Sequence, residues 1–286
     1  MADDHITPLA SLSLTHVYYN PDDPLSYLGA FLSLLPQALC VVYATLFWST
    51  REAEVLLMFL GQLACEALNF VLKRLIKEER PTTLPGGGPA GKGYGMPSSH
   101  AQFAVFWAVA ASLFLLVRHR PERVVAAATS RGSSSTTPAP TLADVSRAYR
   151  AGGLPAASAS IEAYAHGPWT LPQRAFASAG ALVVAGLVAW SRVYLGYHTV
   201  RQVAAGCVAG GGCAAAWFAV TYLMRETGAL AWVLELPPAR WLRMRDLVVE
   251  EDPCQAGWEK WEARRRVMKE KERERGKGKG KGGKGL

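Results

Sequence analysis

Three short stretches of the chain combine histidine with residue types that bind phosphate: Lys73–Pro81, Pro97–His100 and Ser191–His198. A phosphate group in transfer carries negative charge on its non-bridging oxygens, so catalysis needs fixed positive groups and N–H donors around it. Imidazole adds a nucleophile or a proton donor. The three stretches therefore predict a site that hydrolyses a phosphate compound, provided that the fold brings them together.

The candidate phosphate ligands are three cations and a pair of serines. Lys73, Arg80 and Arg192 supply positive charge, and an Arg can bind two oxygens at once whereas a Lys acts as a point charge. The Ser98 hydroxyl and the backbone N–H of Ser99 add neutral donors. Together these residues predict a pocket that holds one phosphate group.

The two histidines, His100 and His198, are the candidates for making and breaking bonds. One would attack phosphorus while the other protonates the leaving oxygen. Gln202 follows His198 by one helical turn and could hold that imidazole in one tautomer. A lone histidine in a membrane protein is more often structural, but two beside phosphate-type donors favour catalysis.

The stretch Pro97–His100 stands directly before an apolar run. Ser99 is expected to cap the helix, with Gln102 completing the capping-box pattern. The free N–H groups and the positive end of the helix dipole at such a start favour an anion, above all a phosphate.

The composition predicts a membrane protein, because half of the 286 residues are apolar and they gather in long runs. A helix needs about 20 apolar residues to cross a bilayer. The predicted fold class is therefore all-α, a multi-span helical bundle. The expected spans are 25–48, 55–76, 101–117, 175–190 and 203–224.

The second expected span carries polar residues in its interior. Glu66, Asn69, Lys73 and Arg80 are expected on one helical face, because their spacing follows the helical repeat. Charged side chains inside a membrane generally face a bundle interior or a wet cavity. Lys73 and Arg80 could instead be flanks that extend to the membrane surface, and for Arg80 alone that interpretation is favoured. For the whole set, which includes Glu66 deep in the run, a functional face is favoured.

The chain divides into an N-terminal segment, 1–24, a membrane core, 25–225, and a C-terminal segment with a basic tail, 226–286. The core is interrupted by residues 121–168, which are rich in Ala, Ser, Thr and Pro and are expected to be disordered. The net charge is +8. Residues 259–286 hold twelve Lys or Arg and five Glu, so 12 − 5 = +7 of it belongs to the tail.

The basic tail could bind an anionic lipid surface. A charged run of this kind is more often simply solvated, and that interpretation is favoured. No nucleic-acid-binding motif accompanies the basic residues, so a nucleic acid is not expected as partner. The five cysteines form no C-x-x-C pair, so neither a zinc site nor a disulfide is expected.

Five spans bring the three phosphate-binding stretches to one membrane face by parity alone. Arg118, Arg120, Arg225 and the basic tail fall on the opposite face. Cytoplasmic loops carry an excess of Lys and Arg, so the site is expected on the non-cytosolic side and the tail in the cytosol.

The pattern Lys73-x6-Arg80-Pro81, Pro97-Ser98-Ser99-His100 and Ser191-Arg192-x5-His198 resembles the three-part signature of the type 2 phosphatidic-acid phosphatase superfamily, which shares its site with vanadium haloperoxidases. The resemblance implies a metal-independent, cofactor-free phosphatase in an all-helical membrane bundle. It also implies that His198 is the nucleophile, forming a phosphohistidine, and that His100 is the acid for the leaving group. The implied phosphate ligands are Lys73, Arg80, Ser98, Ser99 and Arg192.

Two departures from the broad pattern, Ser99 for a usual Gly and Gln202 for a usual Asp, resemble one subfamily, the eukaryotic dolichyl-diphosphatases. So do the stretches Leu14–Val17, Lys92–His100 and Ser191–Thr199. The resemblance covers most of residues 11–120 and 173–225. It implies a multi-pass enzyme of the endoplasmic-reticulum membrane with a lumenal site. Its substrate would be dolichyl diphosphate, cleaved to dolichyl phosphate and phosphate, which recycles the carrier for protein N-glycosylation.

Three other functions are alternatives to this interpretation. A broad lipid phosphate phosphatase would act on phosphatidic acid and similar lipids without preference. A non-catalytic lipid-phosphate binder would lack a histidine, yet both His100 and His198 are present. A transporter is disfavoured, because five spans with no visible inverted repeat do not fit that architecture.

Overall fold

The computed structural model describes residues 10–12, 17–81, 93–119, 142–165, 169–249 and, in the tail, 257–258, 260–261, 263–265 and 267–272. These residues fall into two units. The first comprises the chain up to His119 together with Thr170–Asp246, and the second comprises the remainder. In the first unit the helices are α1 (Pro24–Leu32), α2 (Leu35–Thr50), α3 (Ala53–Ile76), α4 (Ser99–Leu113), the π-helical turn η1 (Phe114–Arg118), α7 (Leu171–Tyr194), α8 (Val200–Glu226), α9 (Ala229–Glu235) and α10 (Pro237–Trp241).

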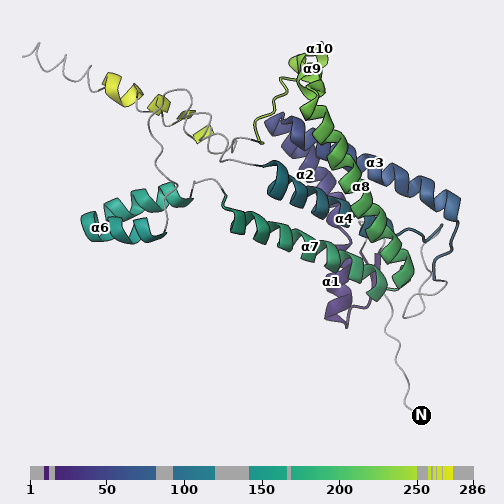
Figure 1. Cartoon of the computed structure of the whole chain (residues 1–286). Helices are drawn as coiled ribbons and strands as arrows, with labels where there is room; N and C mark the ends of the chain where they lie inside the picture. The colour runs from purple at the N-terminus through teal and green to yellow at the C-terminus, as the bar shows by residue number, and fades with distance from the viewer. Residues whose placement is uncertain are drawn as a thin grey trace, which may run out of the picture. The chain divides into compact units, whose positions relative to one another are not determined.

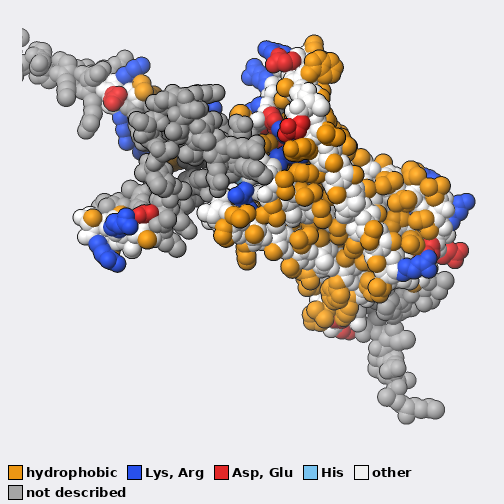
Figure 2. All heavy atoms as spheres, viewed as in Figure 1, with side chains coloured by type: hydrophobic (Ala, Val, Ile, Leu, Met, Phe, Trp, Pro, Cys, Tyr) orange, Lys and Arg blue, Asp and Glu red, His pale blue; other side chains and the backbone are white. Residues whose placement is uncertain are grey.

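Five helical segments of the described chain are long and apolar enough to cross a membrane, which confirms the predicted spans. Each is somewhat longer than predicted, and α1 with α2 makes a single span, Pro24–Thr50. Figure 2 shows one face of this unit covered mostly by hydrophobic side chains, with charged side chains mostly near helix ends. Such a surface suits contact with lipid, because apolar side chains there need no water.

Helix α4 is the centre of the first unit, packing most extensively against α7 and α8 and also against α3 (Figure 1). Its contacts with α8 are close because α8 presents glycines to it. A Cβ at Gly206 would lie 2.6 Å from the backbone oxygen of Ser98, and one at Gly210 would lie 2.3 Å from that of Gln102. Small residues permit this close packing in lipid, where van der Waals contact drives helix association.

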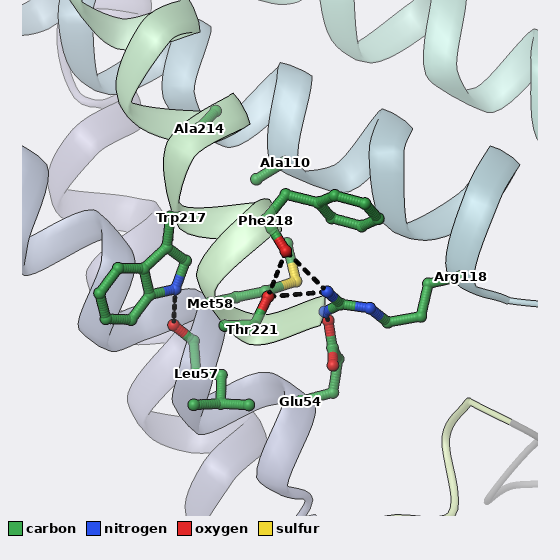
Figure 3. A pocket seen from close by; sticks show the side chains of 9 residues that line it. All are labelled: Glu54, Leu57, Met58, Ala110, Arg118, Ala214, Trp217, Phe218 and Thr221. Carbon is green, nitrogen blue, oxygen red and sulfur yellow. Dashed lines mark hydrogen bonds and ion pairs between the residues drawn. The ribbon is translucent and has the colours of Figure 1, made fainter. Parts of the chain in front are cut away.

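At the end of the bundle where α3 begins, buried charges join three elements (Figure 3). The Glu54 carboxylate accepts hydrogen bonds from Arg118, at 2.5 Å, and from Arg225, at 2.6 Å. Arg118 also donates to the Thr221 hydroxyl at 2.7 Å. A buried carboxylate is tolerated only with such partners, so this network ties α3, η1 and α8 together.

Beyond α8 the chain folds back on the start of α3. The backbone N–H of Ala53 donates to the Arg245 carbonyl at 2.7 Å, and the Arg245 N–H donates to the Arg51 carbonyl at 3.0 Å. The Arg245 guanidinium also pairs with the buried Glu52 at 2.8 Å. The first unit therefore continues to Asp246, and the boundary predicted at 225 falls inside it.

A short antiparallel hairpin, β1 (Ala10–Leu12) and β2 (Val17–Tyr19), contacts the third phosphate-binding stretch. The Tyr18 N–H donates to the Tyr197 hydroxyl at 2.7 Å, and the buried Val17 packs against Tyr197. The hairpin thus helps to position the loop before His198. Of the stretch 14–17, residues 14–16 lie outside the described residues.

In the second unit, helix α6 (Leu142–Ala165) lies inside the insertion that was expected to be disordered. That expectation is wrong for these residues, because their Ala and Leu content favours a helix despite the Ser and Gly among them. Gly153, with φ 67°, interrupts the helix with a kink. Residues 121–141 and 166–168 of the insertion lie outside the described residues. In the tail, the described residues of 257–272 are helical and their side chains are exposed, as expected for a solvated charged helix.

Candidate active site

The structure brings the three stretches that were predicted to bind phosphate together at one end of the bundle. This is the end where α3 and α7 finish and where α4 and α8 begin. Electrostatic interactions connect the five charged or titratable side chains of the stretches with one another. These five side chains are Lys73, Arg80, His100, Arg192 and His198.

Arg80 reaches this cluster from an irregular segment, not from a helical face as the spacing suggested. Helix α3 ends at Ile76, and Lys77 adopts a left-handed conformation with φ 54°. The chain then pairs with the loop before α4, where the Gly95 N–H donates to the Glu78 carbonyl at 2.7 Å. Arg80 is half-buried and interacts electrostatically with Lys73, which favours a place in the cluster over an isolated flank at the membrane surface.

The polar face expected on α3 is present only in part. Asn69 is buried and Lys73 half-buried, whereas the Glu66 side chain is exposed. Glu66 interacts electrostatically with Lys73 but is not gathered with the phosphate ligands. Its position on the helix points it away from the α3–α4 contact that Asn69 makes.

Ser98, not Ser99, is the N-cap of α4, and its side chain makes no capping hydrogen bond. The Gln102 side chain does not return to the cap either. Its Oε1 accepts a hydrogen bond from Asn69 at 2.7 Å, and its Nε2 donates to the Cys65 carbonyl at 2.8 Å. The expected capping box is wrong, because the buried amides of Asn69 and Gln102 satisfy each other and join α4 to α3.

Arg192 is 3% exposed and is held on two sides. Its Nη1 donates to the Ser33 hydroxyl at 2.7 Å, and its guanidinium lies 4.4 Å from the ring centre of Tyr197. Ser33 was not among the predicted site residues. Pro36 was the available signal, because a proline inside an apolar run marks a break in the helix, and Ser33 lies fully buried at that break between α1 and α2.

His198 lies in the loop between α7 and α8 and is almost fully buried. Its Nδ1 lies 3.2 Å from the Gln202 Oε1. Burial, together with the charges of Arg192 and Arg80, lowers the pKa of His198 to about 3. The ring is therefore neutral near pH 7. Since the amide oxygen accepts a hydrogen bond from Nδ1–H, the Nε2 lone pair is free for attack.

Four buried polar atoms in this cluster have no hydrogen-bond partner within the described residues: Ser98 Oγ, His100 Nε2, Arg80 Nε and Arg192 Nε. Buried donors without partners are rare and require an explanation. Two of these atoms belong to the guanidinium groups of Arg80 and Arg192. The other two, the Ser98 hydroxyl and the His100 ring nitrogen, lie at the N-terminal end of α4. A bound anion with several oxygens would satisfy this set of donors. Ser99, whose N–H lies at the same helix start, is half-buried.

The sequence of this chain matches the PAP2 superfamily over residues 54–226. A Neurospora crassa protein assigned as a dolichyldiphosphatase is 57% identical over 93% of this chain and 96% of that protein. Human dolichyldiphosphatase 1 is 37% identical over 73% of this chain and 71% of that protein. A crystal structure of a PAP2 type phosphatidylglycerolphosphate phosphatase from Bacillus subtilis matches with a TM-score of 0.42 and 20% identity, covering 71% of this chain and 79% of that chain. The chain therefore belongs to the PAP2 superfamily and, within it, to the family of the proteins named dolichyldiphosphatase.

Proposed function

We propose that this protein hydrolyses dolichyl diphosphate to dolichyl phosphate and phosphate. The observation that carries the proposal is the cluster of buried polar atoms of Arg80, Arg192, Ser98 and His100 that find no hydrogen-bond partner among the described residues, at the end of a bundle of apolar helices. The names of the relatives supply the substrate. The position at the helix ends suits a lipid whose apolar chain stays in the bilayer while its diphosphate reaches the site.

In the first step, the Nε2 lone pair of His198 attacks the terminal phosphorus and forms an N–P bond. The P–O bond to dolichyl phosphate breaks, and His100 transfers its proton to the leaving oxygen. Lys73, Arg80 and Arg192 neutralise the charge on the non-bridging oxygens, with help from the Ser98 hydroxyl and the N–H of Ser99.

In the second step, water attacks the phosphohistidine. His100, now neutral, accepts a proton from that water, and the N–P bond breaks to release phosphate and neutral His198. The ring of His100 interacts with the backbone of Ser33, while its Nε2 has no hydrogen-bond partner within the described residues. That free nitrogen is the one available to exchange protons with the substrate and with water.

We place the enzyme in the endoplasmic-reticulum membrane with its site in the lumen and its basic tail in the cytosol. The support is the excess of Lys and Arg at the other end of the bundle and in the tail, by the positive-inside rule. Its product would re-enter the cycle that carries sugars for protein N-glycosylation. A cysteine-accessibility experiment on sealed microsomes, with single cysteines in the tail and at Tyr94, tests this orientation.

The activity is tested by phosphate release from the purified full-length protein in detergent with EDTA present. Dolichyl diphosphate, dolichyl phosphate and phosphatidic acid are compared, and His198→Ala is the control. We expect release from the diphosphate, unchanged by EDTA because the site's donors are cationic, and none from the variant. Comparable release from phosphatidic acid would instead indicate a broad phosphatase, and no release at all would indicate a lipid-phosphate binder.

The roles of His198 and Gln202 are separated by a second comparison. His198→Ala removes the nucleophile and is expected to abolish turnover. Gln202→Ala removes only the group that orients it, so we expect a much smaller loss. Equal losses in the two variants would show that Gln202 does more than orient the ring.

A further inference from the structure

We propose that Glu78 is a positioning residue for the nucleophile and that it acts on His198 through the amide of Gln202. The proposal rests on the proposed role of His198 as nucleophile. It concerns a residue outside the three cations and two histidines that touch the phosphate.

The Gln202 side chain is buried and all of its hydrogen-bonding positions near the site are occupied. Its Nε2 donates to Glu78 Oε1 at 3.0 Å and to the Glu79 carbonyl at 2.8 Å. Its Oε1 lies 3.2 Å from His198 Nδ1 and accepts from the Thr199 N–H at 3.3 Å. An amide that faces two acceptors on one side must turn its NH₂ group to that side.

This orientation decides which nitrogen of His198 carries the proton. An amide oxygen beside Nδ1 requires a proton there, which leaves Nε2 unprotonated. A reversed amide would present its NH₂ group to Nδ1 and favour the opposite tautomer, with Nε2 protonated and unable to attack. Glu78 therefore keeps His198 in the reactive tautomer without contacting it.

The same contacts explain why an amide stands at position 202, where the broader superfamily pattern has a carboxylate. A carboxylate there would place oxygen against the Glu79 carbonyl and against the Glu78 carboxylate, with no proton to share. With Gln202 in place, the negative charge near the imidazole is that of the Glu78 carboxylate. A chain of two hydrogen bonds through the Gln202 amide links this carboxylate to His198.

The backbone around Glu78 is built to keep this contact. The Gly95 N–H binds the Glu78 carbonyl at 2.7 Å, and a Cβ at Gly95 would lie 2.7 Å from the Gln202 amide. Only glycine lets this loop cover the amide so closely. The other Glu78 oxygen pairs with Arg201 at 3.2 Å, but that arginine is 78% exposed and holds it weakly.

The test is a double-mutant cycle of Glu78→Ala and Gln202→Ala in the full chain, with kcat and KM measured for dolichyl diphosphate. Glu79→Gln is the matched control, because it removes the same charge from the adjacent residue, which contacts Gln202 through its backbone carbonyl. We expect Glu78→Ala to lower kcat about tenfold or more with KM unchanged, by analogy with the partners that orient metal-binding histidines, whose loss has effects of that size. In the Gln202→Ala background we expect no further loss.

Glu78→Gln provides the conservative rescue. Its side-chain oxygen can still accept from the Gln202 amide, so this variant should be more active than Glu78→Ala. Thermal unfolding of each variant in detergent checks that the fold is kept, and we expect melting temperatures close to that of the wild type for Glu78→Gln and Glu79→Gln.

Three results would overturn the proposal: losses from Glu78→Ala and Gln202→Ala that multiply in the double variant, a Glu79→Gln variant as impaired as Glu78→Ala, or no rescue by Glu78→Gln. Failure of the proposed function is recognised separately. Acid-stable and base-stable phosphoenzyme is measured with labelled substrate in the wild type and in His198→Ala. If wild-type protein forms a base-stable, acid-labile adduct that His198→Ala lacks, the nucleophile stands and only the role of Glu78 is in question.

Discussion

The close approach of α8 to α4 predicts that a single methyl group at Gly206 disturbs the active site. Gly206 lies under the start of α4, and a Cβ there would be 2.6 Å from the Ser98 backbone oxygen. Real Cβ contacts essentially never fall below 3.0 Å, so the two helices must separate by at least 3.0 − 2.6 = 0.4 Å. Because the neighbouring atom is backbone, no side-chain rotation can relieve the contact.

The cost of Gly206→Ala has two parts. Overpacking of a tight contact destabilises by about 1–3 kcal/mol, while replacing glycine inside a helix by alanine stabilises by about 1 kcal/mol. The net loss is therefore small, but the displaced element carries Ser98. Since a misplacement of 1 Å can cost on the order of 100-fold in rate, we expect kcat to fall roughly tenfold.

Gly212→Ala is the matched control, because it lies on the same helix and a Cβ there would meet no atom within 4 Å. Phosphate release and thermal unfolding are measured on both variants in the same detergent. We expect Gly212→Ala to keep its activity and to unfold at an equal or higher temperature. A Gly206→Ala variant with the same kcat and the same unfolding temperature as Gly212→Ala would refute the close packing of α8 on α4.

Three further predictions concern other contacts of the first unit. Ser33→Ala removes the hydroxyl that Arg192 binds at 2.7 Å, so we expect weaker phosphate binding, seen as a KM increase in steady-state assays with little change in unfolding temperature; an unchanged KM would contradict it. Arg118→Ala leaves the buried Glu54 carboxylate with one fewer partner, so we expect the free energy of unfolding to fall by about 3 kcal/mol. Thermal or denaturant unfolding measures this loss, and a variant as stable as the wild type would show that the network contributes nothing. The pKa of His198 is lowered to about 3, so the ring stays neutral as the pH falls from 8 to 5. NMR of labelled histidine, with the signal assigned by comparison with His198→Asn, should therefore show no titration in that range. A titration near pH 6.5 would mean that the ring is solvated and not beside the Arg192 charge.

The spans, and the three stretches that meet at one end of the bundle, followed from the sequence because both depend on local pattern. Apolar runs of sufficient length must be helical in lipid, where each backbone N–H and C=O needs a partner within its own segment. Parity of the spans then brings Lys73–Arg80, Pro97–His100 and Ser191–His198 to one end of the bundle. No knowledge of packing was needed for either inference.

Local sequence pattern predicted the wrong contacts where a buried polar side chain forms its hydrogen bonds with another helix. Gln102 has the right spacing for a capping box, yet its side chain binds Asn69 and Cys65 on α3, because a buried amide must find hydrogen-bond partners and these are supplied by the neighbouring helix. Glu66 shares the helical repeat of Asn69, but the packing of α4 decided which of the two is buried.

Residue types and apolar runs were enough to predict a five-span helical bundle with two histidines and three cations at one end. How those groups are held could be learned only from the folded chain: the Ser33 hydroxyl accepts a hydrogen bond from Arg192, and Glu78 accepts one from the Gln202 amide that contacts His198. Charge and hydropathy are local properties of the sequence, whereas the bonds of Ser33 to Arg192 and of Glu78 to Gln202 join residues 159 and 124 positions apart. Their partners are defined only when the helices meet.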